Sequence, residues 1–361
     1  MKKQHVWVIL LLWASLTAFA WFSPAKAMSD SERRPLAQFP AVSLESLSSG
    51  KCMRQFETYS LDQFPFRDSF RTVKSLFHRY ALGHRDNNGI YLTDGYAVKQ
   101  EYPLNQDSVA YALGRLNHIY DRYLKESRVY MAIVPDKGYY LADRAGQLSM
   151  DYEALFELVE SGMPWAEQID LTGVLSPEAY YRTDTHWRQE HLLDAAGVIC
   201  QAMGVEALKP EQVTVTSLER PFYGVYYGQA ALPMEPETIC LLESELLSAC
   251  TVYDHETGKT GSVYDRTKLD SRDLYDVYLS GARAMLTVEN PNGRTDRELI
   301  VFRDSFGSSM VPLLLQDYGR VTLVDIRYIS SDMLGQFLDF HGQDVLMLYS
   351  TLVLNGSSAM K

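Results

Sequence analysis

The sequence predicts an α/β protein built around a parallel sheet. Its C-terminal part alternates between short apolar runs, typical of buried strands, and longer runs typical of helices. A strand–helix–strand–helix–strand order implies parallel pairing through right-handed crossovers. The elements expected in this part are strands at 298–302, 321–326 and 344–350 and helices at 307–319 and 331–340.

The preceding part of the chain supplies further elements. The apolar run VYMAIV (129–134) predicts a buried strand that ends at Pro135. The run IYLT (90–93) is bracketed by Asn-Gly and Asp-Gly, which predicts a hairpin. Helices are expected where apolar residues recur at three- and four-residue steps, at about 66–83, 107–125, 151–160 and 188–203.

Two segments differ from this pattern. Residues 28–65 are turn-rich and irregular, and the whole stretch 28–100 is expected to form an N-terminal segment that packs on the core. Within the α/β domain expected at 101–361, residues 205–298 hold scattered Pro, Gly and Tyr. Their short β-prone pieces, such as YDVYL and AMLTV, predict an insertion or cap.

The N-terminus is typical of a targeting segment. Lys2 and Lys3 precede an apolar stretch that ends at Phe22, and Ala25-Lys26-Ala27 fits a cleavage site. The apolar stretch is long for a signal peptide and short for a membrane span. Residues 1–27 are therefore expected to be either a signal peptide or a retained membrane anchor. Both alternatives place the rest of the chain outside the cytoplasm, secreted or anchored at the cell envelope.

Charge and cysteine content exclude some classes of partner. The 46 acidic residues outnumber the 34 basic ones, so the formal net charge is −12 and a nucleic-acid partner is not expected. The four cysteines, at 52, 200, 240 and 250, fit no zinc-site spacing. Cys240 and Cys250 are close enough in sequence to form a disulfide, although free buried cysteines are also common.

The pentapeptide FRDSF occurs twice, at 66–70 and at 302–306. The first copy opens an amphipathic helix, for which a structural role is sufficient. The second follows an apolar strand and leads into a helix, and ligands of open parallel sheets bind beyond such strand ends. A helix start there also offers N–H donors. Ser305 is therefore the candidate nucleophile, while simple capping of the helix by Asp304 or Ser305 is the structural alternative.

A serine nucleophile needs a base, and among the eight histidines His186 is the candidate. It lies two residues after Asp184, a spacing at which the carboxylate can reach the imidazole Nδ1–H and leave Nε2 facing the serine. A metal site built from Asp184, His186 and His191 is the alternative, but no further ligand cluster is evident. Neither a metal nor another cofactor is expected.

These motifs resemble a known family. Asp184-Thr185-His186-Trp187 with a distant Asp304-Ser305-Phe306 resembles the DHHW family, which is related to the AlgX/AlgJ-like SGNH-type polysaccharide O-acetyltransferases. The resemblance implies a flavodoxin-like SGNH-hydrolase fold with permuted motif order, since the Asp/His pair precedes the serine. It runs from about residue 38 to the C-terminus and includes the segments 64–70, 88–96, 134–137 and 324–328.

The resemblance also implies roles for individual residues. The catalytic residues implied are Ser305 as nucleophile, His186 as base and Asp184 as orienting acid, and the substrate-binding candidates are Arg327, Tyr226 and Tyr227. One departure concerns the oxyanion site: where the family pattern has a Gly-Gly-Asn turn, this chain has Ser280-Gly281-Ala282. Loss of one oxyanion donor typically lowers the rate by about 10²–10³.

The predicted function is an extracytoplasmic serine O-acetyltransferase or acetylesterase acting on a cell-surface or exported polysaccharide. Its expected partners are the polysaccharide, an acetyl donor and membrane-bound acetylation machinery. One alternative is a non-catalytic glycan-binding envelope protein that retains the SGNH-like fold, which Ala282 favours. Another is a structural role in the envelope.

Overall fold

The structure, a computed structural model, describes residues 3–293 and 295–361. The chain divides into two compact units. The larger comprises residues 91–224 and 235–361, and the smaller comprises the chain up to Ile90 together with residues 225–234. The packing of residues 28–100 on the core stays a prediction.

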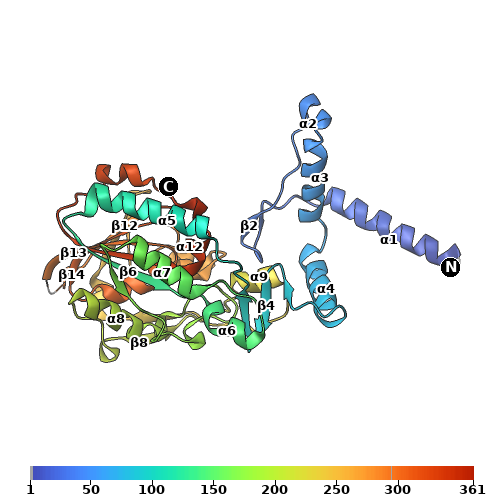
Figure 1. The fold of residues 1–361 in the computed structure, drawn as a ribbon. Coiled ribbons are helices and arrows are strands. Elements are labelled where there is room, and N and C mark those ends of the chain that lie inside the picture. The colour runs from blue at the N-terminus through green and yellow to red at the C-terminus, as the bar shows by residue number, and fades with distance from the viewer. Residues whose placement is uncertain (1–2, 294) are drawn as a thin grey trace. The chain divides into compact units, whose positions relative to one another are not determined.

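An eight-stranded sheet forms the centre of the larger unit (Figure 1). Strands β7, β6, β15, β13 and β14 are neighbours in that order and are parallel, whereas β12, β10 and β11 continue the sheet in antiparallel fashion. The predicted α/β class with a parallel sheet is therefore confirmed. In sheet order the strands are β11 (Lys259–Gly261), β10 (Thr251–Asp254), β12 (Met285–Glu289), β14 (Tyr318–Val324), β13 (Thr295–Arg303), β15 (Asp344–Ser350), β6 (Arg128–Val134) and β7 (Glu167–Ile169).

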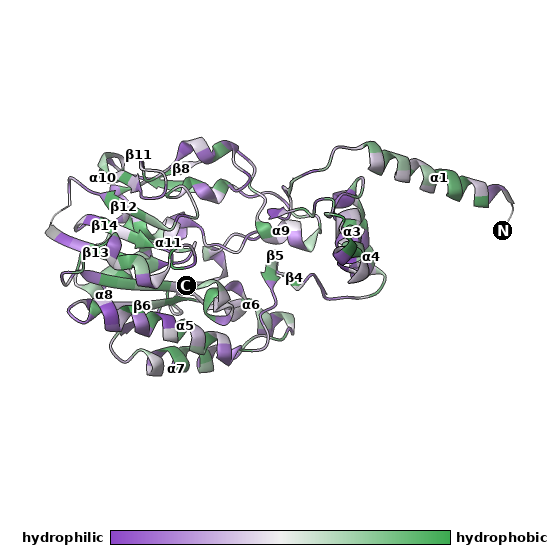
Figure 2. Cartoon of the chain, turned by 90° about the horizontal axis from the view of Figure 1, so that it is seen from above, coloured by the Kyte–Doolittle hydropathy of each residue, from purple (hydrophilic) through white to green (hydrophobic). Residues whose placement is uncertain are grey.

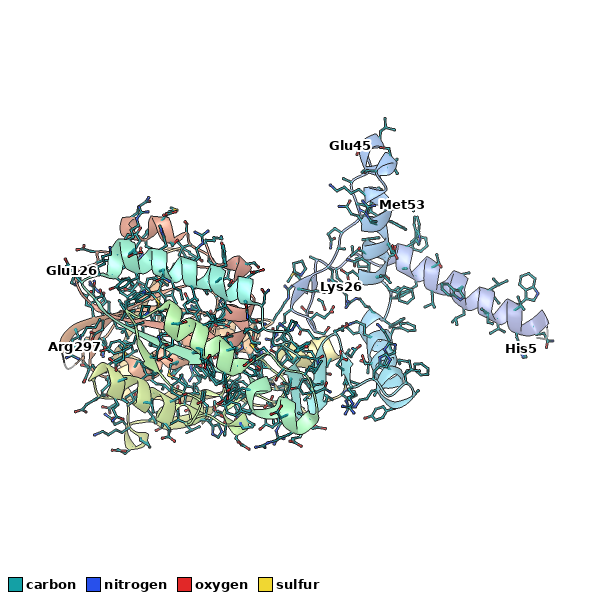
Figure 3. All side chains as sticks on the ribbon, in the orientation of Figure 1. His5, Lys26, Glu45, Met53, Glu126 and Arg297 are labelled. Atoms are coloured by element: carbon teal, nitrogen blue, oxygen red, sulfur yellow. The ribbon has the colours of Figure 1, made fainter. Side chains whose placement is uncertain are left out.

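The central strands are apolar on both faces because both faces of the sheet are covered. In β13, Leu299 and Val301 belong to one buried hydrophobic cluster, and Ile300 and Phe302 belong to the other. Side chains fill the space between the sheet and its covering helices (Figure 3). The covering helices are α8 (Leu193–Met203) on the Leu299 side, and α5 (Gln106–Ile119) and α7 (Tyr152–Gly162) on the Ile300 side.

Most of the predicted helices and strands are confirmed. The helices expected from about residues 107 and 151 are α5 and α7, and the expected strands are β6, β13, β14 and β15. The predicted hairpin is β4 (Ile90–Thr93) with β5 (Tyr96–Lys99). Its turn residues Asp94 and Gly95 both have positive φ (49° and 81°), as a two-residue hairpin turn requires.

The region 205–298 contributes more to the sheet than an insertion would, because β10, β11 and β12 all extend it. One β-prone piece, at 284–288, is β12. The strand expected at 275–279 is wrong: Leu274–Val277 form a 3-10 helix instead. Its start is capped by the Asp273 carboxylate, which accepts a hydrogen bond from the N–H of Tyr275 (3.0 Å). An alternation of Tyr and Val on a buried surface does not distinguish these two conformations.

Three predicted helices are shorter than expected. The segment 307–319 holds α11 (Gly307–Met310) followed by a 3-10 helix at Val311–Leu314, in which Pro312 lacks the N–H that a continuing α-helix needs. The helix expected at 331–340 is likewise a 3-10 helix, Ser331–Gln336. The α-helix expected from residue 188 begins only at α8, after a 3-10 helix at Gln189–His191.

The smaller unit is mainly helical. The helix α1 (Lys3–Phe22) is long and apolar enough to cross a membrane, which fits either a signal peptide or an anchor (Figure 2). The prediction of irregular structure for residues 28–65 is wrong in two segments, which form the helices α2 (Leu44–Ser48) and α3 (Lys51–Asp62). The first FRDSF copy leads into α4 (Arg67–Tyr80), as predicted.

All four cysteines are free and buried, so the structure contains no Cys240–Cys250 disulfide. Burial raises the pKa of the Cys200 thiol to about 12 and that of the Cys250 thiol to about 11. Because the thiolate is the reactive form, these residues behave as small apolar side chains of the core.

Candidate active site

A short loop brings Asp184 and His186 together. Its two ends are joined by an isolated antiparallel bridge between Tyr180 and Trp187. Within the loop, the N–H of Tyr181 donates to the backbone oxygen of His186 (3.0 Å). The segment 180–187 is therefore a small closed loop whose backbone bonds fix the two side chains relative to each other.

Asp184, His186 and Ser305 form one hydrogen-bonded chain. The Asp184 carboxylate is fully buried, and its Oδ1 lies 2.6 Å from Nδ1 of His186 and 3.1 Å from the backbone nitrogen of the same residue. Nε2 of His186 lies 2.8 Å from Oγ of Ser305. Because a carboxylate only accepts, Nδ1 carries the proton and Nε2 is the nitrogen that accepts from the serine hydroxyl.

The turn between β13 and α11 presents Ser305, which is partly exposed. The preceding residue, Asp304, is buried, and its Oδ2 accepts hydrogen bonds from the N–H (2.8 Å) and the hydroxyl (2.6 Å) of Ser350. Oδ1 of Asp304 accepts from the N–H of Phe306 (3.0 Å). Because Ser350 ends the neighbouring parallel strand β15, this carboxylate ties two strand ends together and fixes the turn.

Tyr275 supports the imidazole ring of His186. The two rings are stacked, with centroids 3.9 Å apart and planes inclined by 10°. The Tyr275 hydroxyl is 2.7 Å from Oγ of Ser309, which also accepts from Nε1 of Trp187 (2.8 Å). Burial raises the pKa of Tyr275, so the hydroxyl stays neutral. Nothing in the sequence distinguishes Tyr275 among the 24 tyrosines, so it was not predicted as a site residue.

Glu237 holds the start of the loop from a distant part of the chain. Its carboxylate accepts from the N–H of Arg182 (2.8 Å) and from both the N–H (2.8 Å) and the hydroxyl (2.8 Å) of Thr183. These bonds satisfy the backbone directly before Asp184. Glu237 was not predicted as a site residue either, because its contact with the loop exists only in the folded chain.

Lys137 lies beneath the same loop. Its side chain is buried, and Nζ donates to the backbone oxygens of Ala97 (2.5 Å) and Tyr181 (2.9 Å). Burial lowers the pKa of Lys137 to about 7, an effect that the negative charges of Asp184 and Glu237 oppose. The ammonium therefore joins β5 to the loop and stands near the buried Asp184 carboxylate.

The chain is similar to a known protein family. Residues 175–324 match the family model described as DHHW protein. The resemblance to the DHHW family is thereby confirmed. Asp184, His186 and Ser305 all lie within the matched segment. No curated protein sequence matches the chain.

Several solved structures share the fold. A DHHW family protein from Eubacterium siraeum has a TM-score of 0.61 and 20% identity, covering 76% of this chain and 94% of that one. Bacillus cereus PatB1, solved with a sulfonyl adduct, has a TM-score of 0.58 and 17% identity, covering 74% and 95%. Structural similarity at such low sequence identity concerns the fold alone. The predicted SGNH-like α/β fold is therefore confirmed.

The turn that departs from the DHHW pattern is tied to the strand that carries Ser305. Arg303, buried at the end of β13, donates from Nη2 to the backbone oxygen of Gly281 (3.2 Å) and from Nη1 to that of Asp304 (3.3 Å). Gly281 has a φ of 76°, and an added Cβ would lie 2.0 Å from Oδ1 of Asp276. The side chain of Ala282 is exposed and offers no hydrogen-bond donor.

The predicted substrate-binding residues differ in their placement. Arg327 follows β14 and forms two hydrogen bonds with Asp325, from Nε to Oδ1 (2.9 Å) and from Nη2 to Oδ2 (2.7 Å). Tyr226 and Tyr227 lie in α9 (Val225–Ala230), which belongs to the smaller unit. Arg327 belongs to the larger unit, and the substrate-binding role of all three residues stays a prediction.

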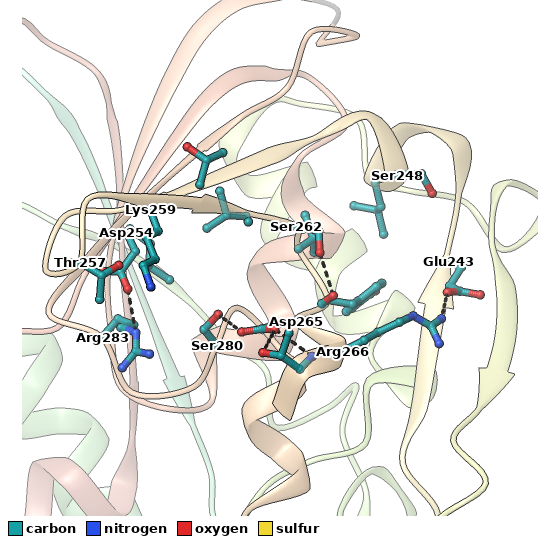
Figure 4. A pocket seen from close by; sticks show the side chains of 18 residues that line it. Glu243, Ser248, Asp254, Thr257, Lys259, Ser262, Asp265, Arg266, Ser280 and Arg283 are labelled. Carbon is teal, nitrogen blue, oxygen red and sulfur yellow. Dashed lines mark hydrogen bonds and ion pairs between the residues drawn. The ribbon is translucent and has the colours of Figure 1, made fainter. Parts of the chain in front are cut away.

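A groove of about 740 Å³ lies elsewhere on the larger unit (Figure 4). Neither Ser305 nor His186 lines it. The charged side chains that line it include Glu243, Asp254, Lys259, Asp265, Arg266 and Arg283. Several are already paired, such as Arg266 with Glu243 (2.6 Å) and Arg283 with Asp254 (3.0 Å). The groove is therefore separate from the hydrogen-bonded chain of Ser305.

Gly224 permits a close approach to the loop that holds Asp184. A Cβ added at Gly224 would lie 2.3 Å from the backbone oxygen of Thr183 and 2.4 Å from Cα of Asp184. We expect Gly224→Ala to lower the free energy of unfolding by about 1–3 kcal/mol, because backbone must shift to admit the methyl group. Urea denaturation measures this difference.

Gly173→Ala is the matched control, because an added Cβ at Gly173 meets nothing within 4 Å. It should change the free energy of unfolding by less than about 0.5 kcal/mol. Equal stability of the two variants would contradict the close packing described for Gly224.

Proposed function

We propose that the chain is an extracytoplasmic serine O-acetyltransferase or acetylesterase that acts on a cell-surface or exported polysaccharide. One observation carries the proposal: Oγ of Ser305 lies 2.8 Å from Nε2 of His186, whose Nδ1 lies 2.6 Å from Oδ1 of Asp184. A serine hydroxyl bonded to a base, with the base bonded to a buried acid, is the arrangement that activates serine for acyl transfer.

The mechanism follows from these contacts. Oγ of Ser305 attacks the carbonyl carbon of an acetyl donor while Nε2 of His186 takes its proton. Asp184 stabilises the resulting imidazolium through Nδ1–H. The bond to the leaving group then breaks, and His186 returns the proton to that group. A sugar hydroxyl or water, deprotonated by His186, attacks the acetyl-serine; as the bond to Oγ breaks, His186 returns the proton to Oγ and Ser305 is released. Transfer and hydrolysis differ only in the acceptor.

The oxyanion of the tetrahedral intermediate needs N–H donors. Three N–H groups after Ser305 are already used: Phe306 donates to Asp304 Oδ1 (3.0 Å), Gly307 to the Asp304 backbone oxygen (3.1 Å), and Ser308 to that of Ser305 (3.2 Å). The N–H of Ser305 itself has no partner among the residues that the structure describes. We therefore assign this N–H to the oxyanion.

Substrate class and location rest on further support. The apolar helix α1 fits export or anchoring of the chain. The PatB1 structure carries a sulfonyl adduct, and sulfonyl groups attach to activated nucleophiles, as this proposal requires of Ser305. Arg327, Tyr226 and Tyr227 remain proposed contacts for the polysaccharide, and the Arg327 side chain is 20% exposed. An acetyl donor and membrane-bound acetylation machinery complete the proposed partners.

The proposal is tested with the full-length chain in detergent and p-nitrophenyl acetate as donor. We expect release of p-nitrophenolate together with one acetyl group on Ser305, found by peptide mass spectrometry after rapid acid quenching. A Ser69→Ala variant, which alters the other FRDSF copy, should be acetylated like the parent. Background release and an unmodified Ser305 would contradict the enzyme proposal.

The second candidate is a non-catalytic glycan-binding envelope protein. The exposed methyl group of Ala282, which stands where the DHHW pattern has Asn, favours it. If the protein is such a binder, we expect glycan binding to survive Ser305→Ala. We also expect no acetyl group on Ser305 of the parent. The same acetylation experiment, followed by a glycan-binding titration, therefore separates the two candidates.

A further inference from the structure

The helix α4 buries its polar face and exposes its apolar face. On the buried side, Ser75 is 1% exposed and its hydroxyl accepts from the Asn87 amide (2.7 Å). Arg71 on the same side donates to the backbone oxygen of Gly228 (2.8 Å). The opposite side carries five apolar side chains in one stripe, between 49% and 77% exposed, which we call the α4 stripe: Phe66, Phe70, Val73, Phe77 and Tyr80.

This arrangement is the reverse of an ordinary surface helix, whose apolar stripe faces the core. The stripe extends over four turns, with members three or four residues apart, and four of its five side chains are aromatic. A contiguous exposed apolar surface of this kind marks a site of interaction. Because the polar side of α4 is already satisfied by its own unit, the α4 stripe is the side left for a partner.

Helix α1 indicates which partner covers the stripe. The most apolar part of α1, Gln4–Phe22, has a mean hydropathy of 1.8, and none of it is buried. Phe19 in its last turn stacks on Phe66, the first member of the stripe, with ring centroids 5.6 Å apart and planes inclined by 6°. Trp21 and Phe22 at the end of α1 are 77% and 89% exposed. The apolar surface of a membrane-length helix thus continues into the α4 stripe.

The charge of the segment favours an anionic surface. Arg67 and Arg71 of α4 are paired with Glu32 on the polar side (2.6 and 3.1 Å), and the helix carries two further basic residues, Lys74 and Arg79, although the chain as a whole has a net charge of −12. Lys74 is exposed beside the stripe. The guanidinium of Arg79 lies 6.0 Å from the centre of the Tyr80 ring, at the end of the stripe. A helix that has aromatic residues on one side and basic residues along the edges of that side binds in the interface between water and an anionic membrane.

We propose that α4 binds the surface of a lipid bilayer containing anionic lipids, with the α4 stripe about 5–10 Å into the boundary between headgroups and acyl chains. This binding holds the smaller unit on the membrane at the outer end of α1. It gives the first FRDSF copy a function distinct from that of the second. The inference does not depend on acetyl transfer.

The test uses the full-length chain reconstituted into vesicles of phosphatidylcholine and phosphatidylglycerol. A fluorophore is attached at Val73→Cys, at Phe77→Cys or at Asp68→Cys, the last on the side away from the stripe, where Asp68 is 64% exposed. The native cysteines are buried, so labelling is selective. We expect brominated lipids to quench the dyes at 73 and 77 several-fold more than the dye at 68.

Two further variants keep the test independent of any single substitution. Lys74→Glu should reduce quenching at residue 77 in vesicles with phosphatidylglycerol and leave it unchanged in phosphatidylcholine alone. Phe70→Ser should reduce quenching at residue 77 in both. Equal quenching at 68, 73 and 77 would overturn the proposal. So would a dye at 77 that neither brominated lipid nor aqueous iodide quenches, because protein would then cover the stripe.

Discussion

Ser305→Ala is expected to reduce the rate of p-nitrophenyl acetate cleavage by a factor of about 10⁴ or more. The rate that remains is that of the uncatalysed reaction plus any acceleration that substrate binding alone provides. The Ser305 hydroxyl is the nucleophile that His186 activates, and without it no acyl-serine forms. The remaining His186–Asp184 pair leaves only direct attack on the ester by imidazole or water. The rate is measured as kcat/KM for p-nitrophenolate release, with parent and variant purified in parallel.

The expected loss is specific because folding should survive the substitution. Ser305 is partly exposed, and among the residues that the structure describes its hydroxyl bonds a single side chain, that of His186, so thermal denaturation should be nearly unchanged. Ser69→Ala is the matched control, since it removes the hydroxyl from an identical pentapeptide in α4. If Ser69→Ala were the inactive variant, or Ser305→Ala kept its rate, the assignment of the nucleophile would be wrong.

The sequence predicted those features of the fold that depend on local pattern. Strands β6, β13, β14 and β15 are continuous apolar runs, and such runs predict a sheet covered on both faces. The pairing of Asp184 with His186 is also local, because the two residues are two positions apart. The contact of His186 with Ser305 spans 119 positions, and the resemblance together with the strand-end rule selected both residues.

Features that depend on tertiary contacts could not be predicted from the sequence. Tyr275 stacks on His186, Glu237 accepts from the loop before Asp184, and Lys137 donates to the loop backbone from beneath. Each is an ordinary residue type whose role arises only when distant segments meet. The segment around Tyr275 was also predicted to have the wrong conformation. Residues that hold a site in place thus carry less sequence signal than residues that react in it.

Asp184→Asn is the second substitution for which we expect a large loss of catalytic rate. An amide at this position can turn its NH₂ toward Nδ1 of His186, so that Nδ1 accepts and the proton moves to Nε2. A protonated Nε2 cannot take the proton of Ser305, and the imidazolium loses its counter-charge. We expect kcat/KM for p-nitrophenyl acetate to fall by roughly 10²–10⁴, the range for loss of the correct tautomer.

A stability measurement separates this tautomer effect from simple unfolding. Removing the Asp184 charge leaves the buried Lys137 ammonium with less compensation, so the midpoint of thermal denaturation should fall while the variant still folds cooperatively. The control is Asp194→Asn, an exposed carboxylate in the first turn of α8 that should change neither rate nor midpoint. A folded Asp184→Asn variant with a rate within about threefold of the parent would contradict the proposed role, because a triad without its acid retains only a small fraction of its activity.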